Sequence, residues 1–199
     1  MNSRTLVTGG YLMQFKQRSQ LFQKQPRAFT IGAIEEINDE WVFFDDETDE
    51  AFLLEDLIDE EFEVSINEEW IPASLRNGNF LIQYPKKKKL QNGDILRIQR
   101  KLLYSFDTLL KNLSDESFYT LAYLLNTHHF SLYDCLYCHN FLSFQPENSP
   151  SDGVNFIVFD NGELVCSVYH QFRISSEEQN HRFELTKATG NRYLLTQLS

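Results

Sequence analysis

Three Asn-Gly dipeptides, at Asn77-Gly78, Asn92-Gly93 and Asn161-Gly162, constrain the fold of this 199-residue chain more than any other feature. Asn and Gly adopt the positive φ angles that two-residue hairpin turns require, so Asn-Gly between strand-like runs predicts an antiparallel hairpin. The runs EWIPASLR, NFLIQY, VNFIVFD and ELVCSVYHQF flank these turns and are rich in β-branched and aromatic residues. The chain is therefore expected to contain much antiparallel sheet.

The segment 28–102 reads as a dense series of short strands. AFTIGAIEEI and EWVFFDD are separated by Asn38-Asp39, and FEVSI, EWIPASLR, NFLIQY and DILRIQRKL follow. Five or six short strands with tight turns in about 75 residues predict a small closed or half-closed antiparallel β-barrel of the SH3-like or OB-like kind. An open meander packed on helices is the alternative.

The remaining chain reads as helices followed by a second sheet. Residues 1–27 are predicted as an N-terminal helical segment, with Tyr11–Gln25 amphipathic and closed by Pro26. In 103–199, helices are predicted from Tyr104, from a Ser114 cap, and over LYDCLYCHNFLSF behind a Ser131 or Asp134 cap. Four strands after the Pro-rich loop at 146–150 predict a four-stranded antiparallel sheet with the helices on one face. The fold class is α+β.

Charge is strongly segregated along the sequence. Between Glu35 and Glu69 there are 17 acidic residues and no Lys or Arg, in a chain of net charge −11. Large apolar residues are interleaved with the acids, so the segment is expected to fold. We predict a surface for a partner protein, with a basic partner favoured by its charge, that is formed by Trp41, Asp45, Asp46, Glu47, Asp49 and Glu50. The alternatives are a solvated face that confers solubility, or internal pairing with a lysine cluster.

That lysine cluster, Lys86, Lys87, Lys88 and Lys89, lies near Arg97 in the sequence. Basic residues on a small barrel predict phosphate contacts, which makes nucleic-acid binding an alternative function. A pI near 4.9 argues against it, because the acidic segment would repel the same polyanion. Lysines that protect an edge strand from aggregation are the preferred interpretation.

Cys135 and Cys138 form a C-x-x-C motif, with Cys166 and His170 downstream. On a helix, positions i and i+3 share a face, so Cys135, Cys138 and Cys166 are candidate zinc ligands. Redox chemistry is a further alternative. The preferred interpretation is three reduced, buried thiols and no cofactor.

Several classes of protein are disfavoured by what the sequence lacks. We find no Gly-rich phosphate loop, G-x-S-x-G or H-E-x-x-H pattern, so an enzyme is not favoured. Three cysteines form no even disulfide framework, and no apolar run is long enough to span a bilayer. A cytoplasmic protein without membrane association is expected.

Three stretches carry a family resemblance: WVFFDDETDEAFLLEDL from Trp41, YDCLYCHNFL from Tyr133 and GVNFIVFDNGELVCSVYHQF from Gly153. They resemble an uncharacterised protein family of Bacillus-type bacteria. The resemblance covers nearly the whole chain and implies a bacterial cytosolic protein. It transfers no catalytic residues, because that family has no assigned activity.

Overall fold

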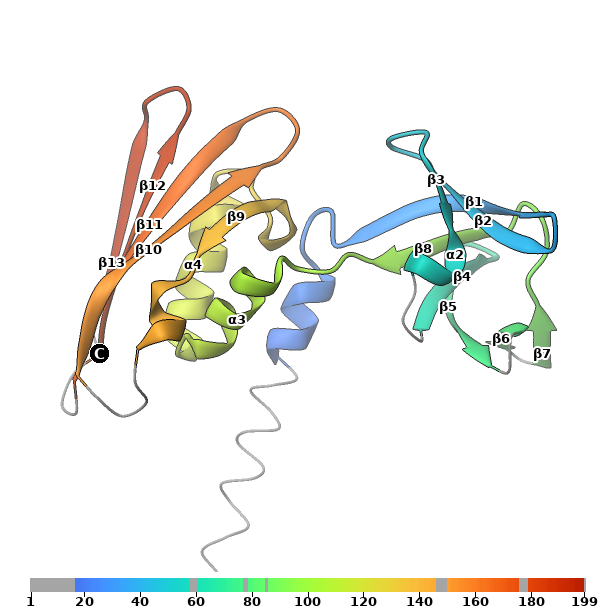
Figure 1. The fold of residues 1–199 in the computed structure, drawn as a ribbon, viewed down its shortest axis with the longest axis horizontal. Coiled ribbons are helices and arrows are strands. Elements are labelled where there is room, and N and C mark those ends of the chain that lie inside the picture. Colours follow the sequence, from blue (N-terminus) through green and yellow to red (C-terminus); the bar gives the residue numbers. More distant parts are fainter. Residues whose placement is uncertain are drawn as a thin grey trace, which may run out of the picture. The chain divides into compact units, whose positions relative to one another are not determined.

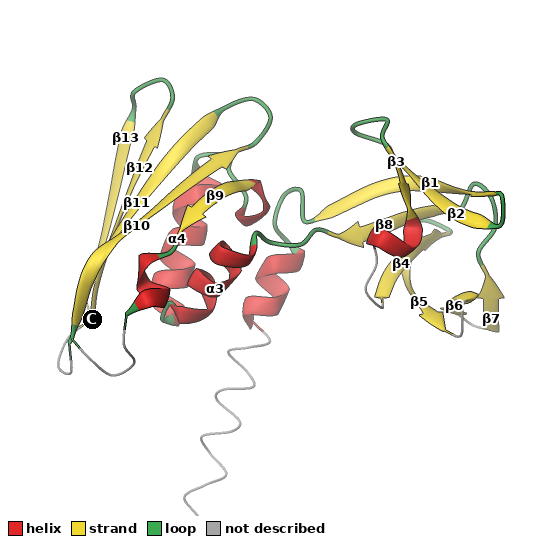
Figure 2. Cartoon of the chain, in the orientation of Figure 1, coloured by secondary structure: helices red, strands yellow, loops and turns green. Residues whose placement is uncertain are grey.

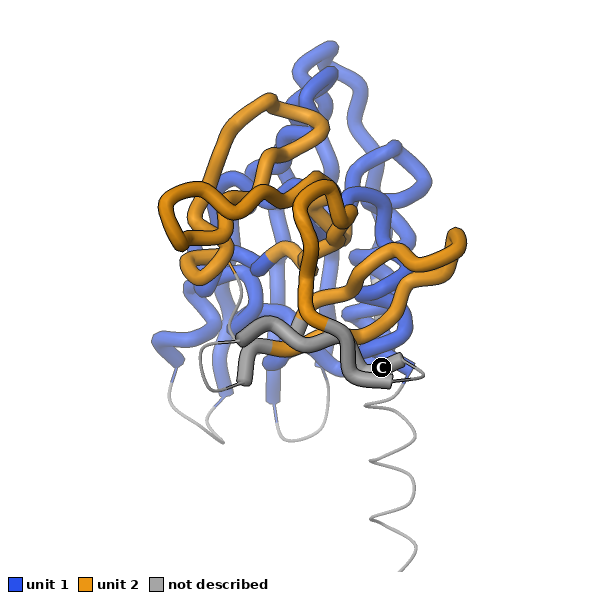
Figure 3. The backbone as a smooth tube through the Cα atoms, turned by 90° about the vertical axis from the view of Figure 1, so that its right-hand side faces the viewer, with its two compact units in different colours: residues 1–27, 101–199 blue, residues 28–100 orange. Residues whose placement is uncertain are grey.

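The chain folds into two compact units. The computed structural model describes residues 17–57, 61–76, 79–84, 86–145, 150–175 and 179–198. Residues 28–100 form one unit, called here the β unit, and residues 1–27 and 101–199 form the other, called the helix–sheet unit (Figure 3). The β unit is thus inserted between Arg27 and Lys101. The sequence did not indicate that the N-terminal segment belongs with the C-terminal half.

The β unit contains one antiparallel sheet (Figure 1). Its strands are β1 (Phe29–Ile37), β2 (Glu40–Asp45), β3 (Ala51–Leu53), β4 (Glu61–Ile66), β5 (Glu69–Arg76), β6 (Asn79–Tyr84), β7 (Lys86–Lys89) and β8 (Ile95–Gln99). The order across the sheet is β3-β2-β1-β8-β4-β5-β6-β7, and the short helix α2 (Leu54–Leu57) follows β3.

The core of the β unit comes from alternate residues of paired strands. Ile34 faces Phe43 across β1 and β2, and Val64 faces Leu96 across β4 and β8. All four side chains are fully buried. Gly32 allows β1 and β2 to approach closely, because a Cβ at this position would collide with the Phe44 carbonyl oxygen.

Of the closed or half-closed barrel predicted for 28–102, the closed form is not found among the described residues. The strand order begins at β3 and ends at β7, and the described residues make no pairing that joins these two strands. β3 has only three residues, which gives a short edge to pair with. The observed sheet is therefore open and has two edges.

The helix–sheet unit places helices against a five-stranded antiparallel sheet (Figure 2). Its helices are a helix over residues 17–23, α3 (Tyr104–Asn112), α4 (Asp115–Thr127) and the 3₁₀ turns η1 (Leu132–Asp134) and η2 (Phe141–Phe144). Its strands are β9 (Cys135–His139), β10 (Ser151–Asp160), β11 (Val165–Ile174), β12 (Gln179–Lys187) and β13 (Arg192–Leu198). Their order is β13-β12-β11-β10-β9.

Two features of the helices agree with the sequence predictions: the Ser114 cap of α4, and the packing of α3 and α4 against the sheet. Ser114 caps α4 by accepting a hydrogen bond from the Ser117 N–H at 3.2 Å, with acids in the first turn. Leu109 and Phe118 are fully buried with Phe159 and Phe183 of the sheet in one core. Residues 11–16 of the predicted N-terminal helix lie outside the described residues.

The predicted third helix over LYDCLYCHNFLSF is wrong. The capping box of Ser131 and Asp134 caps the N-terminus of the single turn η1 only. After that turn the chain extends as β9 and pairs with β10. β9 satisfies the backbone hydrogen bonds along this edge of β10, a tertiary gain that outweighs a weak local helical pattern. The C-terminal sheet consequently has five strands rather than the predicted four.

Across the described ranges, no helix is both long enough and apolar enough to cross a membrane.

Candidate interaction surfaces and buried polar clusters

The predicted acidic surface lies on the turn that joins β2 to β3. Asp45 is buried, and its Oδ1 accepts hydrogen bonds from the N–H groups of Glu47 (2.7 Å) and Thr48 (3.3 Å). The Asp49 N–H donates to the Asp45 carbonyl at 3.0 Å, and Asp49 has a φ of 56°. Asp45 therefore builds the turn instead of standing on its surface.

The other acids of this turn point into solvent. Asp46, Glu47, Asp49 and Glu50 are exposed, and Glu47 pairs with Arg100 at 2.9 Å. The carboxylates of Asp46, Asp49 and Glu50, referred to here as the acidic turn, make no ion pair with any described residue. Trp41 is half-buried against the core of the β unit, so only part of its ring is available to a partner.

Net charge is divided unequally between the two units. Residues 28–100 contain 18 acidic and seven basic residues, which sum to −11. The helix–sheet unit contains the remaining 11 acidic and 11 basic residues, which sum to zero. The β unit alone therefore carries the formal net charge of the whole chain.

Arg97, a candidate phosphate contact, is held inside the β unit. Its guanidinium lies 4.3 Å from the ring centroid of Phe29 and 4.8 Å from that of Trp70, and its Nε donates to Glu63 at 2.5 Å. A guanidinium stacked between two rings and neutralised by a carboxylate is a packing element of the sheet.

The four lysines form the strand β7, at the edge of the sheet beside β6. The side chain of Lys89 is exposed, and those of Lys86, Lys87 and Lys88 lie outside the described residues. Nucleic-acid binding through this run stays a prediction.

The strand β10 separates Cys135 and Cys138, both on β9, from Cys166 on β11. Cys135 and Cys166 lie on either side of Phe159, which pairs with both. Two strand spacings amount to about 9–10 Å, far more than the separation of two sulfurs on one zinc ion. Among the described residues, no group of three His, Cys, Asp or Glu side chains is placed to hold a metal ion.

Burial also keeps these thiols uncharged. It raises the pKa of Cys138 to about 11 and that of Cys166 to about 12, and it raises the pKa of Cys135 further still. A protonated thiol is a poor nucleophile. Cys138 and Cys166 are buried in the core, whereas Cys135 is half-buried against it, so the prediction of buried thiols holds for two of the three.

A buried polar chain crosses β10, β11 and β12. The Leu142 N–H donates to Asn155 Oδ1 at 3.1 Å, so Asn155 Nδ2 faces His170 Nδ1 at 3.0 Å and donates to it. The proton of His170 is then on Nε2, which lies 2.9 Å from His181 Nδ1. His181 Nε2 is buried without a hydrogen-bond partner among the described residues. The strand alternation indicated an inward His170, but not its partners, because they come from other strands.

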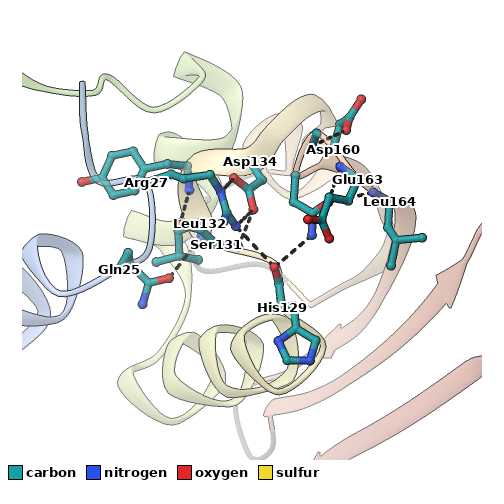
Figure 4. A network of polar contacts seen from close by, with 12 residues as sticks. Gln25, Arg27, His129, Ser131, Leu132, Asp134, Asp160, Glu163 and Leu164 are labelled. Atoms are coloured by element: carbon teal, nitrogen blue, oxygen red, sulfur yellow. Dashed lines mark hydrogen bonds and ion pairs between the residues drawn. The ribbon is translucent and has the colours of Figure 1, made fainter. Parts of the chain in front are cut away.

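Arg27 connects the N-terminal segment to the loops of the helix–sheet unit (Figure 4). It donates to Asp134 Oδ1 (2.6 Å) and Oδ2 (2.5 Å) and to the His129 carbonyl (3.3 Å). Gln25 accepts the Leu132 N–H at 3.2 Å. The side chain of Asp134 is only 2 % exposed, so this pair is a buried anchor at the last residue before the β unit.

Comparison with known proteins agrees with the resemblance seen in the sequence. The uncharacterized protein YisN of Bacillus subtilis (strain 168) is 30 % identical over 128 residues, which cover 63 % of this chain and 64 % of that protein. The match thus spans just under two thirds of this relative. No solved structure matches the chain. Residues 16–197 match the family described as protein of unknown function (DUF2777), and the chain therefore belongs to the DUF2777 family.

Proposed function

We propose that this chain is a non-enzymatic interaction or regulatory protein whose β unit binds a basic protein partner through the acidic turn. The observation that carries the proposal is the confinement of the whole net charge of −11 to residues 28–100. A concentrated field of one sign accelerates encounter with an oppositely charged surface and disfavours other partners.

The acidic turn is the part of this unit best prepared for such contact. The cations Arg97 and Arg100 are already paired with Glu63 and Glu47, whereas Asp46, Asp49 and Glu50 keep their carboxylates in solvent. The hydrogen bonds of Asp45 hold the turn in one conformation, so little ordering is needed on binding. A face that serves only solubility is the competing interpretation, and it predicts no specific partner.

The test compares two variants with equal charge change in affinity purification from the bacterial host. The first is Asp46→Lys, Asp49→Asn and Glu50→Lys, in which Asn is used because residue 49 has a positive φ. The control is Glu35→Lys, Glu36→Gln and Glu40→Lys, on β1 and β2 near the opposite end of this strand pair and roughly 13–20 Å from Asp46, for four to six residues at ~3.3 Å each. All six side chains are exposed.

The proposal expects a partner that wild type and control retain, that the turn variant loses, and that salt releases. Retention of the same proteins by all three, or equal loss in both variants, would contradict recognition by the turn. Circular dichroism confirms that each variant is folded.

A further inference from the structure

The five-stranded sheet of the helix–sheet unit has two different faces. Ile157, Val168 and Phe183 point from neighbouring strands into the core beneath the helices and are fully buried. Side chains alternate along a strand, so the intervening residues point to the opposite side, called here the outer sheet face. In Figure 2, α3 and α4 lie against one side of β9–β13, and none of the helices that the structure describes covers the other side.

The middle of the outer sheet face is aromatic and apolar. Register places His139, Phe156, Tyr169, Glu184 and Leu194 side by side in one row across all five strands. The ring centroids of Phe156 and Tyr169 are 5.0 Å apart, and Tyr137 of the next row lies 6.3 Å from Phe156. Tyr137 and Leu194 are each 51 % exposed and Tyr169 is 44 % exposed, so these side chains contact water over much of their surface.

Charged residues lie toward both ends of this face and on β12, where Glu184 is part of the row, and their charges balance one another. Asp152 faces Arg173 across β10 and β11, and Arg182 lies 3.8 Å from Glu184. With Asp160 and Arg192, the outer sheet face carries three acids and three arginines, a formal sum of zero. The aromatic cluster on β9, β10 and β11 is thus bordered by paired charges, and an aromatic patch next to polar and charged groups is typical of a protein interface.

The size of the face is sufficient for a specific dimer. β10 and β11 have ten residues each, so the face is roughly 30 Å long, and five strands make it about 20 Å wide. Two such faces in contact bury on the order of 1,200 Å², the lower end of stable protein interfaces.

We infer that the outer sheet face binds the same face of a second copy of this chain, so that two sheets pack across a two-fold axis. In an isologous dimer each patch meets itself, so a patch with an excess of one sign would repel its own copy. Here both the face and the helix–sheet unit sum to zero, although the chain carries −11. A polyanion would gain no net attraction from such a face, whereas a second copy meets complementary charges and an equal apolar row. Aligned sheets pack in this way at about 10 Å.

The dependence on salt distinguishes dimerisation through the outer sheet face from binding of a partner at the acidic turn. The two β units of a dimer repel each other, and salt screens that repulsion while leaving apolar contact intact. The dimer is therefore expected to tighten as salt increases, whereas binding of a basic partner to the acidic turn weakens.

The test is sedimentation equilibrium of the full chain over a range of protein and salt concentrations. Wild type is expected to move from 23.5 kDa toward twice that mass. Tyr169→Lys and Leu194→Lys, each tested alone, should raise the dimer dissociation constant at least about tenfold, the effect of losing an interface hot spot. The control is Tyr123→Lys on α4, which replaces an aromatic residue on the helical side that is more exposed (66 %) than Tyr169 (44 %).

A wild-type protein that stays monomeric at every concentration overturns the inference. So does a dimer that Tyr123→Lys weakens as much as Tyr169→Lys does, or a mass change that requires added single-stranded DNA. The two substitutions, Tyr169→Lys and Leu194→Lys, are at independent positions on the face, so if one variant misfolds the other still tests the inference. The acidic-turn variant is expected to dimerise as wild type does.

Discussion

His170 Nε2 lies 2.9 Å from His181 Nδ1 in the core of the helix–sheet unit. Asn155 Nδ2 donates to His170 Nδ1, and His170 Nε2 in turn donates to His181 Nδ1, an arrangement that requires both imidazoles to be neutral. Burial lowers the pKa of His170 to about 3, with a further contribution from the charge of His181, and burial also lowers the pKa of His181. Protonating either ring would place two donors against each other or introduce a buried charge.

The helix–sheet unit should therefore lose stability in acid. Below pH 6.5 the two histidines take up protons in the unfolded chain but not in the folded one, so the free energy of unfolding falls as pH falls. Each imidazole contributes about 1.4 kcal/mol per pH unit until its folded pKa is reached. Amide hydrogen exchange of β11 and β12, followed over a range of pH, measures this free energy of unfolding. His181→Phe should make the dependence shallower, and His129→Asn, at an exposed histidine outside the outer sheet face, should leave it unchanged. Equal slopes in all three proteins would disprove the assignment.

The Arg27–Asp134 pair should hold the N-terminal segment in place. Arg27→Ala leaves the Asp134 carboxylate buried without this partner, at a cost of about 3 kcal/mol. Amide exchange of residues 17–27 should accelerate, and Arg27→Lys should restore little, because one ammonium cannot bind both carboxylate oxygens. Lys24→Ala, at an exposed position in the same segment, serves as the control. Unchanged exchange in Arg27→Ala would show that the anchor is dispensable.

Arg97 should stabilise the β unit through its two rings. Arg97→Met removes the stacked guanidinium and leaves Glu63 without this ion pair, with an expected loss of about 1–2 kcal/mol. Trp41 and Trp70 are the only tryptophans and both lie in the β unit, so denaturation followed by tryptophan fluorescence reports that unit alone. Arg100→Met, which loses a pair with the exposed Glu47, should cost at most about 0.5 kcal/mol. Equal losses would argue against a special role for stacking.

The cysteines should be inert in the folded protein. A thiol reagent at neutral pH should modify none of Cys135, Cys138 and Cys166 within minutes, because burial raises the pKa of each thiol. In denaturant all three should react. Zinc should leave the unfolding temperature unchanged, and a rise in that temperature would indicate a site that the described residues do not form.

The turns show what local sequence could predict. Asn161-Gly162 joins β10 to β11 as expected, with a φ of 86° at the glycine. Gly93 also has a positive φ, but β8 pairs with β1 and β4 instead of the preceding strand. Asn77-Gly78 lies outside the described residues, between the paired strands β5 and β6. A dipeptide determines a turn, whereas the partner of a strand depends on distant segments.

For the candidate surfaces too, the sequence showed some features, whereas others depend on contacts between strands. The acids of residues 45–50 were visible in the sequence, but not that Asp45 turns inward while Asp46, Asp49 and Glu50 stay in solvent. The outer sheet face and the His170–His181 contact were not visible, because each combines residues of several strands. Only the register between those strands brings these side chains together.

The sequence by itself determined the α+β class, the acidic N-terminal third, most of the hairpins and the α4 cap, because each depends on neighbouring residues. The tertiary structure decided the rest: β9 extended along β10 instead of forming a helix, an open sheet in place of a barrel, and the N-terminal segment packed with the C-terminal half. These outcomes depend on backbone hydrogen bonds and buried contacts between segments far apart in the chain. The acidic segment of the sequence therefore belongs to a separate unit, the β unit of residues 28–100, whose charges sum to the net charge of the whole chain.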